Sequence, residues 1–109
     1  MAEIVELSDA TFEEQVIQSG VPVMVDFSAV WCGPCQALHP IIEAIAPEFD
    51  GQVKICSIDI DKNRDTPSKY QIMAVPTLLF FRDGNPVDTF TGLLGKNELR
   101  KKLEALIEG

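Results

Sequence analysis

The chain has few basic residues and no long apolar run. Its 109 residues carry 17 acidic against 9 basic side chains, a formal charge of −8, and no basic cluster offsets this excess. Nucleic-acid binding draws most of its affinity from Lys and Arg on phosphates, so we expect no nucleic-acid partner. No apolar run approaches the roughly 20 residues that cross a bilayer, so we expect no membrane association.

Cysteine is also scarce. Three cysteines cannot all pair within one chain, and two of them, Cys32 and Cys35, are separated by only two residues. Residues 1–7 have neither the basic region nor the apolar core of a secretory signal. These features favour a protein of the reducing cytoplasm over a disulfide-stapled secreted domain.

No linker, repeat or low-complexity segment divides the sequence, which predicts a single domain over residues 1–109. Thr11 and Glu14 have the spacing of a capping box for a first helix, which Gly20 would end as the C′ residue. A second apolar-periodic helix runs from Pro34 through Phe49. Further patterns predict strands at 4–7, 21–27, 53–58, 77–81 and 87–91, a short helix that Thr66-Pro67 caps and starts, and a C-terminal helix over 99–107. This order predicts an α/β fold, with a central mixed five-stranded sheet flanked by helices on both faces.

The strongest chemical signal is Cys32-Gly33-Pro34-Cys35, directly after the second predicted strand. Because the next helix begins at Pro34, Cys32 would lie at a helix N-terminus, where free N–H groups and the helix dipole favour a thiolate. An exposed Cys32 would then be the nucleophile that attacks disulfides, and Cys35 the resolving thiol. Pro34 would stiffen the short loop and, with Gly33, tune its redox potential.

The same spacing also supplies half of a zinc site. The remaining ligands would be Cys56 and His39, but Cys56 falls in a predicted central strand and no second Cys-x-x-Cys exists. We therefore expect no metal.

Asp26 is an acid within the apolar run 21–27. It is either a strand-end acid that reaches solvent or a buried carboxyl group whose raised pKa makes it a base near neutral pH. Local sequence leaves both interpretations open.

The segment from Val25 to Cys35, with Val75-Pro76-Thr77, Gly84 and Gly92, closely resembles the thioredoxin family in register over essentially the whole chain. The resemblance implies a thioredoxin fold and a protein-disulfide reductase that needs no cofactor besides its redox-active disulfide. It also implies disulfide-containing protein substrates and regeneration by a thioredoxin reductase. We further expect a monomer.

The resemblance implies roles for individual residues. Asp26 would be buried and would exchange a proton with Cys35. The Val75–Pro76 peptide bond would be cis and would face the disulfide, so that the backbone of Val75 can pair with an extended substrate. A flat apolar rim for substrate docking would be formed by Trp31, Val75, Pro76, Gly92 and Leu93.

Two other functions of the same fold compete with this one. A binding or chaperone subunit would not need both cysteines, and an oxidase or isomerase usually carries a histidine between them, where this chain has Gly33-Pro34. The chain also departs from the common bacterial pattern at Ser28, Gln36 and Ser57, which replace a tryptophan, a basic residue and a lysine, respectively. Ser57 therefore supplies no positive charge to Asp26.

Overall fold

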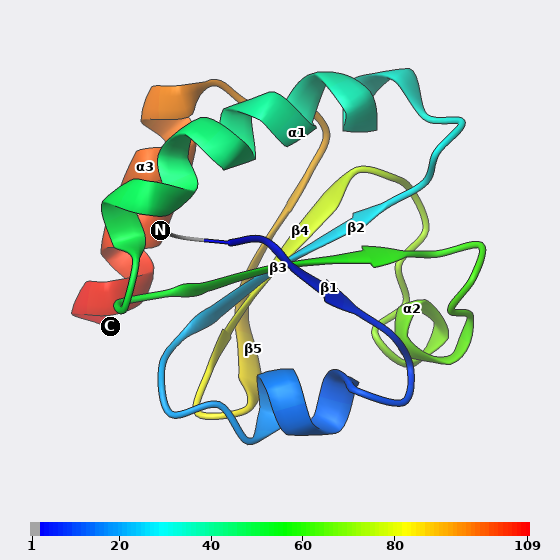
Figure 1. Ribbon diagram of the computed structural model, residues 1–109, viewed down its shortest axis with the longest axis horizontal. Helices are drawn as coiled ribbons and strands as arrows, with labels where there is room; N and C mark the ends of the chain where they lie inside the picture. Colours follow the sequence, from blue (N-terminus) through cyan, green and yellow to red (C-terminus); the bar gives the residue numbers. More distant parts are fainter. Residues whose placement is uncertain (1–2) are drawn as a thin grey trace.

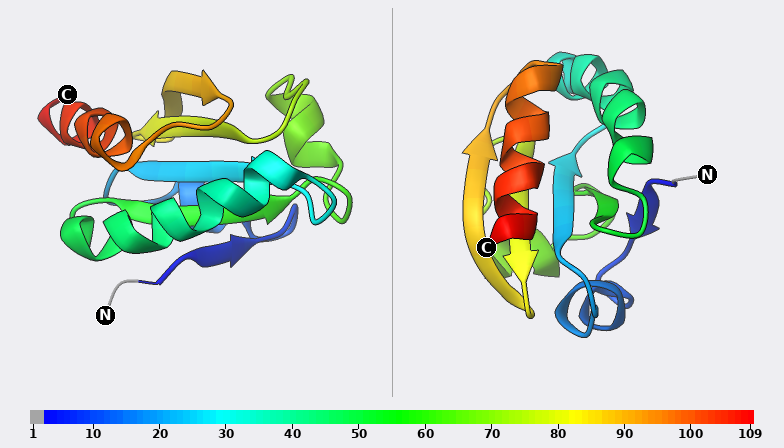
Figure 2. Two further views of the ribbon diagram at one scale, coloured as in Figure 1. Left: turned by 90° about the horizontal axis from the view of Figure 1, so that it is seen from above. Right: turned by 90° about the vertical axis from the view of Figure 1, so that its left-hand side faces the viewer.

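Five strands form one mixed sheet in the order β1-β3-β2-β4-β5 (Figure 1). The computed structural model describes residues 3–109, and its strands are β1 (Val5–Leu7), β2 (Val23–Ser28), β3 (Lys54–Asp59), β4 (Thr77–Arg82) and β5 (Asn85–Thr91). β1 and β2 pair with β3 in parallel, whereas β4 runs antiparallel to β2 and to β5. Figure 2 (left) shows β1 and β5 at opposite edges with β2 between them. The mixed sheet expected from the sequence is confirmed.

Helices cover both faces of this sheet. The helix α1 (Gly33–Ile45), its extension η2 (Ala46–Phe49) and α3 (Lys96–Glu108) cover one face. The short helices η1 (Glu13–Ile17) and α2 (Asp65–Lys69) lie on the other side (Figure 1). Within residues 3–109, no helix is long and apolar enough to cross a membrane.

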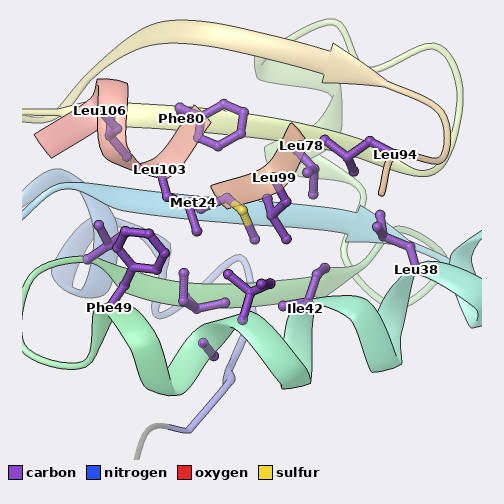
Figure 3. Close-up of a cluster of buried hydrophobic side chains, with 14 residues drawn as sticks. Met24, Leu38, Ile42, Phe49, Leu78, Phe80, Leu94, Leu99, Leu103 and Leu106 are labelled. Atoms are coloured by element: carbon purple, nitrogen blue, oxygen red, sulfur yellow. The ribbon is translucent and has the colours of Figure 1, made fainter. Parts of the chain in front are cut away.

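Alternation along β2 divides its side chains between two cores. Met24 joins the core under α1 and α3, where Figure 3 shows it beside Leu99 and Leu103. Val23, Val25 and Phe27 join the opposite core. Asp26 is two residues from Met24 and therefore lies on the face that α1 covers.

The first helix begins and ends differently from the sequence-based expectation. Ser8 and Thr11 cap each other: the Ser8 N–H donates to Thr11 Oγ1 at 2.9 Å, and the Thr11 N–H donates to Ser8 Oγ at 3.3 Å. The predicted capping box with Glu14 is therefore wrong, because Thr11 is already engaged with Ser8. The helix ends with Gln18 as its C-cap, so the prediction that Gly20 ends it is also wrong.

The β4–β5 hairpin turns at Asp83-Gly84, as predicted. Both residues have positive φ, 53° and 80°, which a two-residue type I′ turn requires. β5 then begins at Asn85, two residues before the expected Val87.

Candidate active site

The Cys32–Cys35 pair lies where β2 leads into α1, and the two residues form a disulfide with a Cα–Cα distance of 5.2 Å. Cys32 is the N-cap of α1, with extended backbone, and Pro34 occupies the first helical turn. The Cys35 N–H donates to Cys32 Sγ at 3.1 Å. Cys32 sulfur thus occupies the place of an N-cap acceptor, where a thiolate would be stabilised by a free helix N–H.

The two cysteines are equally buried in this disulfide, with 4% of each exposed. The expectation of an exposed Cys32 is therefore wrong for the oxidised form. Both residues pack with Ala29, and Ile60 and Val75 cover the same small cluster. The cysteines are distinguished by position, because only Cys32 caps the helix.

Val75 lies against the disulfide, with its carbonyl oxygen 3.7 Å from Cys32 Sγ. The Val75–Pro76 bond is cis, which confirms the expectation drawn from the family resemblance. The Pro76 carbonyl accepts a 2.9 Å hydrogen bond from the Gly92 N–H, and Thr77 Oγ1 donates to the Ala74 carbonyl at 2.7 Å. These contacts hold the backbone of Val75 beside the sulfur atoms.

The rim around the disulfide differs in part from the expected one. Trp31 and Leu93 are exposed and Val75 and Gly92 are half-buried, but Pro76 is buried and offers no docking surface. The Gly92 N–H donates to the Pro76 carbonyl, which places the residue after β5 beside the Pro76 backbone. Two exposed apolar residues, Val30 and Met73, were not predicted. The only sequence signals that could have identified them as part of the rim were their positions, with Val30 beside Trp31 and Met73 shortly before Val75.

Trp31 is held by a residue that the sequence did not link to it. Its indole Nε1–H donates to Asp61 Oδ2 at 2.6 Å. The Ile60 N–H donates to the Ser28 carbonyl at 3.0 Å, which brings the loop after β3 to the end of β2. Asp61 therefore orients the one tryptophan of the chain.

Asp26 is buried, with 2% of its surface exposed, so the alternative of a solvated strand-end acid is wrong. In register it lies between Ser57 of β3 and Leu78 of β4, neither of which carries a charge. Its Oδ1 has no hydrogen-bond partner among the described residues. This loss of solvation raises the pKa of Asp26 to about 7.

A groove of about 320 Å³ connects Asp26 with Cys35. The sheet and the start of α1 form its walls, and its lining residues are Glu6, Asp26, Ser28, Ala29, Val30, Cys35, Gln36, His39, Ser57 and Asp59. Gln36 and Val30 both line the groove, and a hydrogen bond joins them: Gln36 Nε2 donates to the Val30 carbonyl at 2.7 Å. The buried carboxyl group and the second cysteine therefore line the same groove.

Cys56 lies apart from this site. It is fully buried in the core between the sheet and η1, whereas His39 belongs to α1 on the opposite face. Burial raises the pKa of the Cys56 thiol to about 12. Within residues 3–109, no three potential metal ligands cluster.

Comparison with known proteins agrees with this geometry. The thioredoxin family model matches residues 3–105. Thioredoxin from Pseudomonas aeruginosa is 43% identical over 104 residues, covering 95% of this chain and 96% of the relative. Thioredoxin from Staphylococcus haemolyticus is 44% identical over 101 residues, covering 93% and 95%, and that from Haemophilus influenzae is 41% identical over 99 residues, covering 91% and 92%. The chain therefore belongs to the thioredoxin family, and with its Cys32–Cys35 pair on a thioredoxin fold it is a protein-disulfide reductase.

Proposed function

We propose that Cys32 is the attacking thiolate and Cys35 the resolving thiol of this reductase. The observation that carries this assignment is the hydrogen bond from the Cys35 N–H to Cys32 Sγ at the start of α1. Negative charge on Cys32 is favoured there by the free N–H groups and the helix dipole. The Cys32 thiolate attacks a target disulfide and forms a mixed disulfide, and one target sulfur leaves as a thiolate.

Asp26 serves the second step of the cycle. Its carboxylate takes the proton of the Cys35 thiol, and the Cys35 sulfur then attacks Cys32. The Cys32–Cys35 bond forms, the bond to the target breaks, and the second target sulfur leaves. A carboxyl group with a pKa near 7 suits this proton transfer at neutral pH.

Targets dock beside the disulfide on Trp31 and Leu93, and the backbone of Val75 pairs with an extended segment of the substrate. The half-buried Gly92 allows close approach, and its N–H donates to the Pro76 carbonyl, which fixes the backbone directly after Val75. Gly33 and Pro34 tune the redox potential through the geometry of the loop. A thioredoxin reductase returns the pair to the dithiol, and the protein works in the cytoplasm as a single-domain monomer without a bound cofactor.

Reduction of insulin, driven by a thioredoxin reductase and its electron donor, tests these assignments. The protein is expected to sustain turnover, whereas Cys32→Ser and Cys35→Ser are each expected to abolish it. A measured reduction potential separates the reductase from an oxidase or isomerase of the same fold. Target binding that persists in both variants, with no turnover by the unmodified protein, would instead indicate a binding or chaperone subunit.

A further inference from the structure

The catalytic cycle poses a problem for Asp26, because a carboxyl group buried from solvent must release the proton it takes from Cys35. The groove beside Asp26 is the route that the structure offers. Across the sheet, Ser57 gives the groove a neutral hydroxyl, and no lysine or arginine of the described residues lines it. The other titratable groups that line this groove are therefore the candidates for carrying the proton to solvent.

Besides Asp26 and Cys35, three titratable side chains face the groove. Glu6 comes from β1, Asp59 from the end of β3, and His39 from α1; β4 presents only Leu78 to Asp26. Asp59 Oδ1 is engaged by the backbone, since it accepts from the Asp61 N–H at 2.8 Å and the Lys62 N–H at 3.4 Å. Glu6 is an exposed carboxylate on the edge strand.

His39 has the position and the chemistry of a relay. It lies one helical turn after Cys35 on α1, lines the same groove, and has 51% of its side chain exposed, so it contacts both the groove and bulk solvent. Its Nε2 is 3.6 Å from Glu43 Oε2, four residues further along the same helix. Histidine is also the side chain that ordinarily takes up and releases protons near neutral pH.

We propose that His39 is the proton relay of the resolving step, through which Asp26 exchanges its proton with solvent along the groove. This inference rests on the proposed role of Asp26. Asp26 can take the proton of Cys35 only as a carboxylate. Before the resolving attack, its own carboxyl proton therefore passes to water in the groove, and the His39 imidazole accepts it and releases it to bulk solvent. No electrons move in this relay, because it precedes the sulfur exchange.

The test is the rate at which a preformed mixed disulfide on Cys32 is resolved, measured in one turnover with His39→Ala. The substitution removes an exposed side chain and is expected to leave the fold intact. We expect resolution to slow by about fivefold at neutral pH and low buffer concentration, less than the roughly 10²- to 10⁴-fold of a group that transfers a proton directly. Added imidazole is expected to restore the rate of the variant and to leave that of the unmodified protein unchanged.

A matched control moves the histidine by two residues. Ala37 is exposed on α1 and does not line the groove, so Ala37→His combined with His39→Ala keeps the composition but removes the relay. This double variant is expected to be as slow as His39→Ala, whereas Ala37→His alone is expected to resolve normally. Glu6→Gln and Asp59→Asn are each expected to retain imidazole-independent resolution.

An unchanged rate in His39→Ala, or a slow rate that imidazole does not restore, would overturn the relay. Loss of imidazole-independent resolution in Glu6→Gln or Asp59→Asn would assign the exit to that carboxylate instead. Failure of the proposed role of Asp26 is recognised separately, because Asp26→Asn would then resolve mixed disulfides at the normal rate.

Discussion

Asp26 and Ser57 lie opposite each other on the parallel strands β2 and β3. Ser57 offers a hydroxyl group where a cation would offset the charge of a buried carboxylate. The ionised form of Asp26 is therefore disfavoured by burial without compensation, and its pKa is raised to about 7. This arrangement affects the stability of the protein and, in the mechanism we propose, its resolving step.

Asp26→Asn is expected to stabilise the protein at neutral and alkaline pH. A carboxyl group whose pKa is higher in the folded than in the unfolded state destabilises the fold once pH exceeds the unfolded value. The gain from the substitution should therefore grow between the ordinary value of 3.8 and about 7, and stay constant above it. At about 1.4 kcal/mol per pH unit, it reaches at most about 4 kcal/mol. Equilibrium denaturation at a series of pH values measures it.

The exposed Asp50 provides a control for this experiment. Asp50→Asn is expected to change the free energy of unfolding by less than about 0.5 kcal/mol at every pH. Equal stability of Asp26→Asn and the unmodified protein at pH 8 would contradict the raised pKa.

The same Asp26→Asn variant should also separate the two chemical steps. The amide cannot accept the proton of Cys35, so release of the target from the mixed disulfide should slow by about 10²-fold, within the ordinary range for loss of a general base. The initial attack by Cys32 should be almost unchanged, because its thiolate is stabilised by the helix N-terminus. Single-turnover kinetics of each step check this division.

The cysteines should differ in reactivity although both are buried in the disulfide. Limiting iodoacetamide added to the reduced protein should label Cys32 first, and peptide mapping identifies the site. Cys35→Ser should trap mixed disulfides with targets, because the resolving thiol is missing, and Cys32→Ser should trap almost none. Preferential labelling of Cys35 or Cys56 would reverse the assignment.

Removing the carboxylate that holds Trp31 should weaken docking. Asp61→Ala deletes the 2.6 Å acceptor of the indole N–H, so KM for protein disulfides should rise by about threefold with little change in kcat. Because Trp31 is the single tryptophan, its fluorescence reports the loss directly through faster quenching by acrylamide. Asp61→Asn retains an acceptor oxygen and should restore most of both properties. Unchanged acrylamide quenching in Asp61→Ala would show that this hydrogen bond does not hold the ring in solution.

Gly84 should be far less tolerant of substitution than Gly20. Gly84 has a φ of +80°, and a Cβ there would lie 2.8 Å from the Ile17 carbonyl oxygen, so Gly84→Ala should destabilise the protein by about 2 kcal/mol or more. Gly20 has open space around it, so Gly20→Ala should be neutral or should stabilise by about 0.4–1 kcal/mol. Denaturant midpoints of the two variants test the contrast.

Local sequence was sufficient for the features that depend on neighbouring residues. The apolar run of residues 21–27 predicted a central strand that contains Asp26, although it left the burial of the carboxyl group open, and Asp83-Gly84 marked the hairpin turn. Cys32 and Cys35 were placed at a helix start because Pro34 and the following apolar period set its beginning. The resemblance to the thioredoxin family added the cis bond before Pro76, which local pattern alone does not predict.

Tertiary structure decided what depends on residues distant in the chain. The Trp31–Asp61 hydrogen bond spans 30 positions, and the groove combines residues from β1, β2, β3 and α1. Periodicity tells which face a side chain occupies, but not which loop folds over it. The sequence therefore could not predict the burial of Cys32 and Pro76, because packing determines it. It also could not predict the pairing of Thr11 with Ser8, because competition between hydrogen-bond partners determines that pairing.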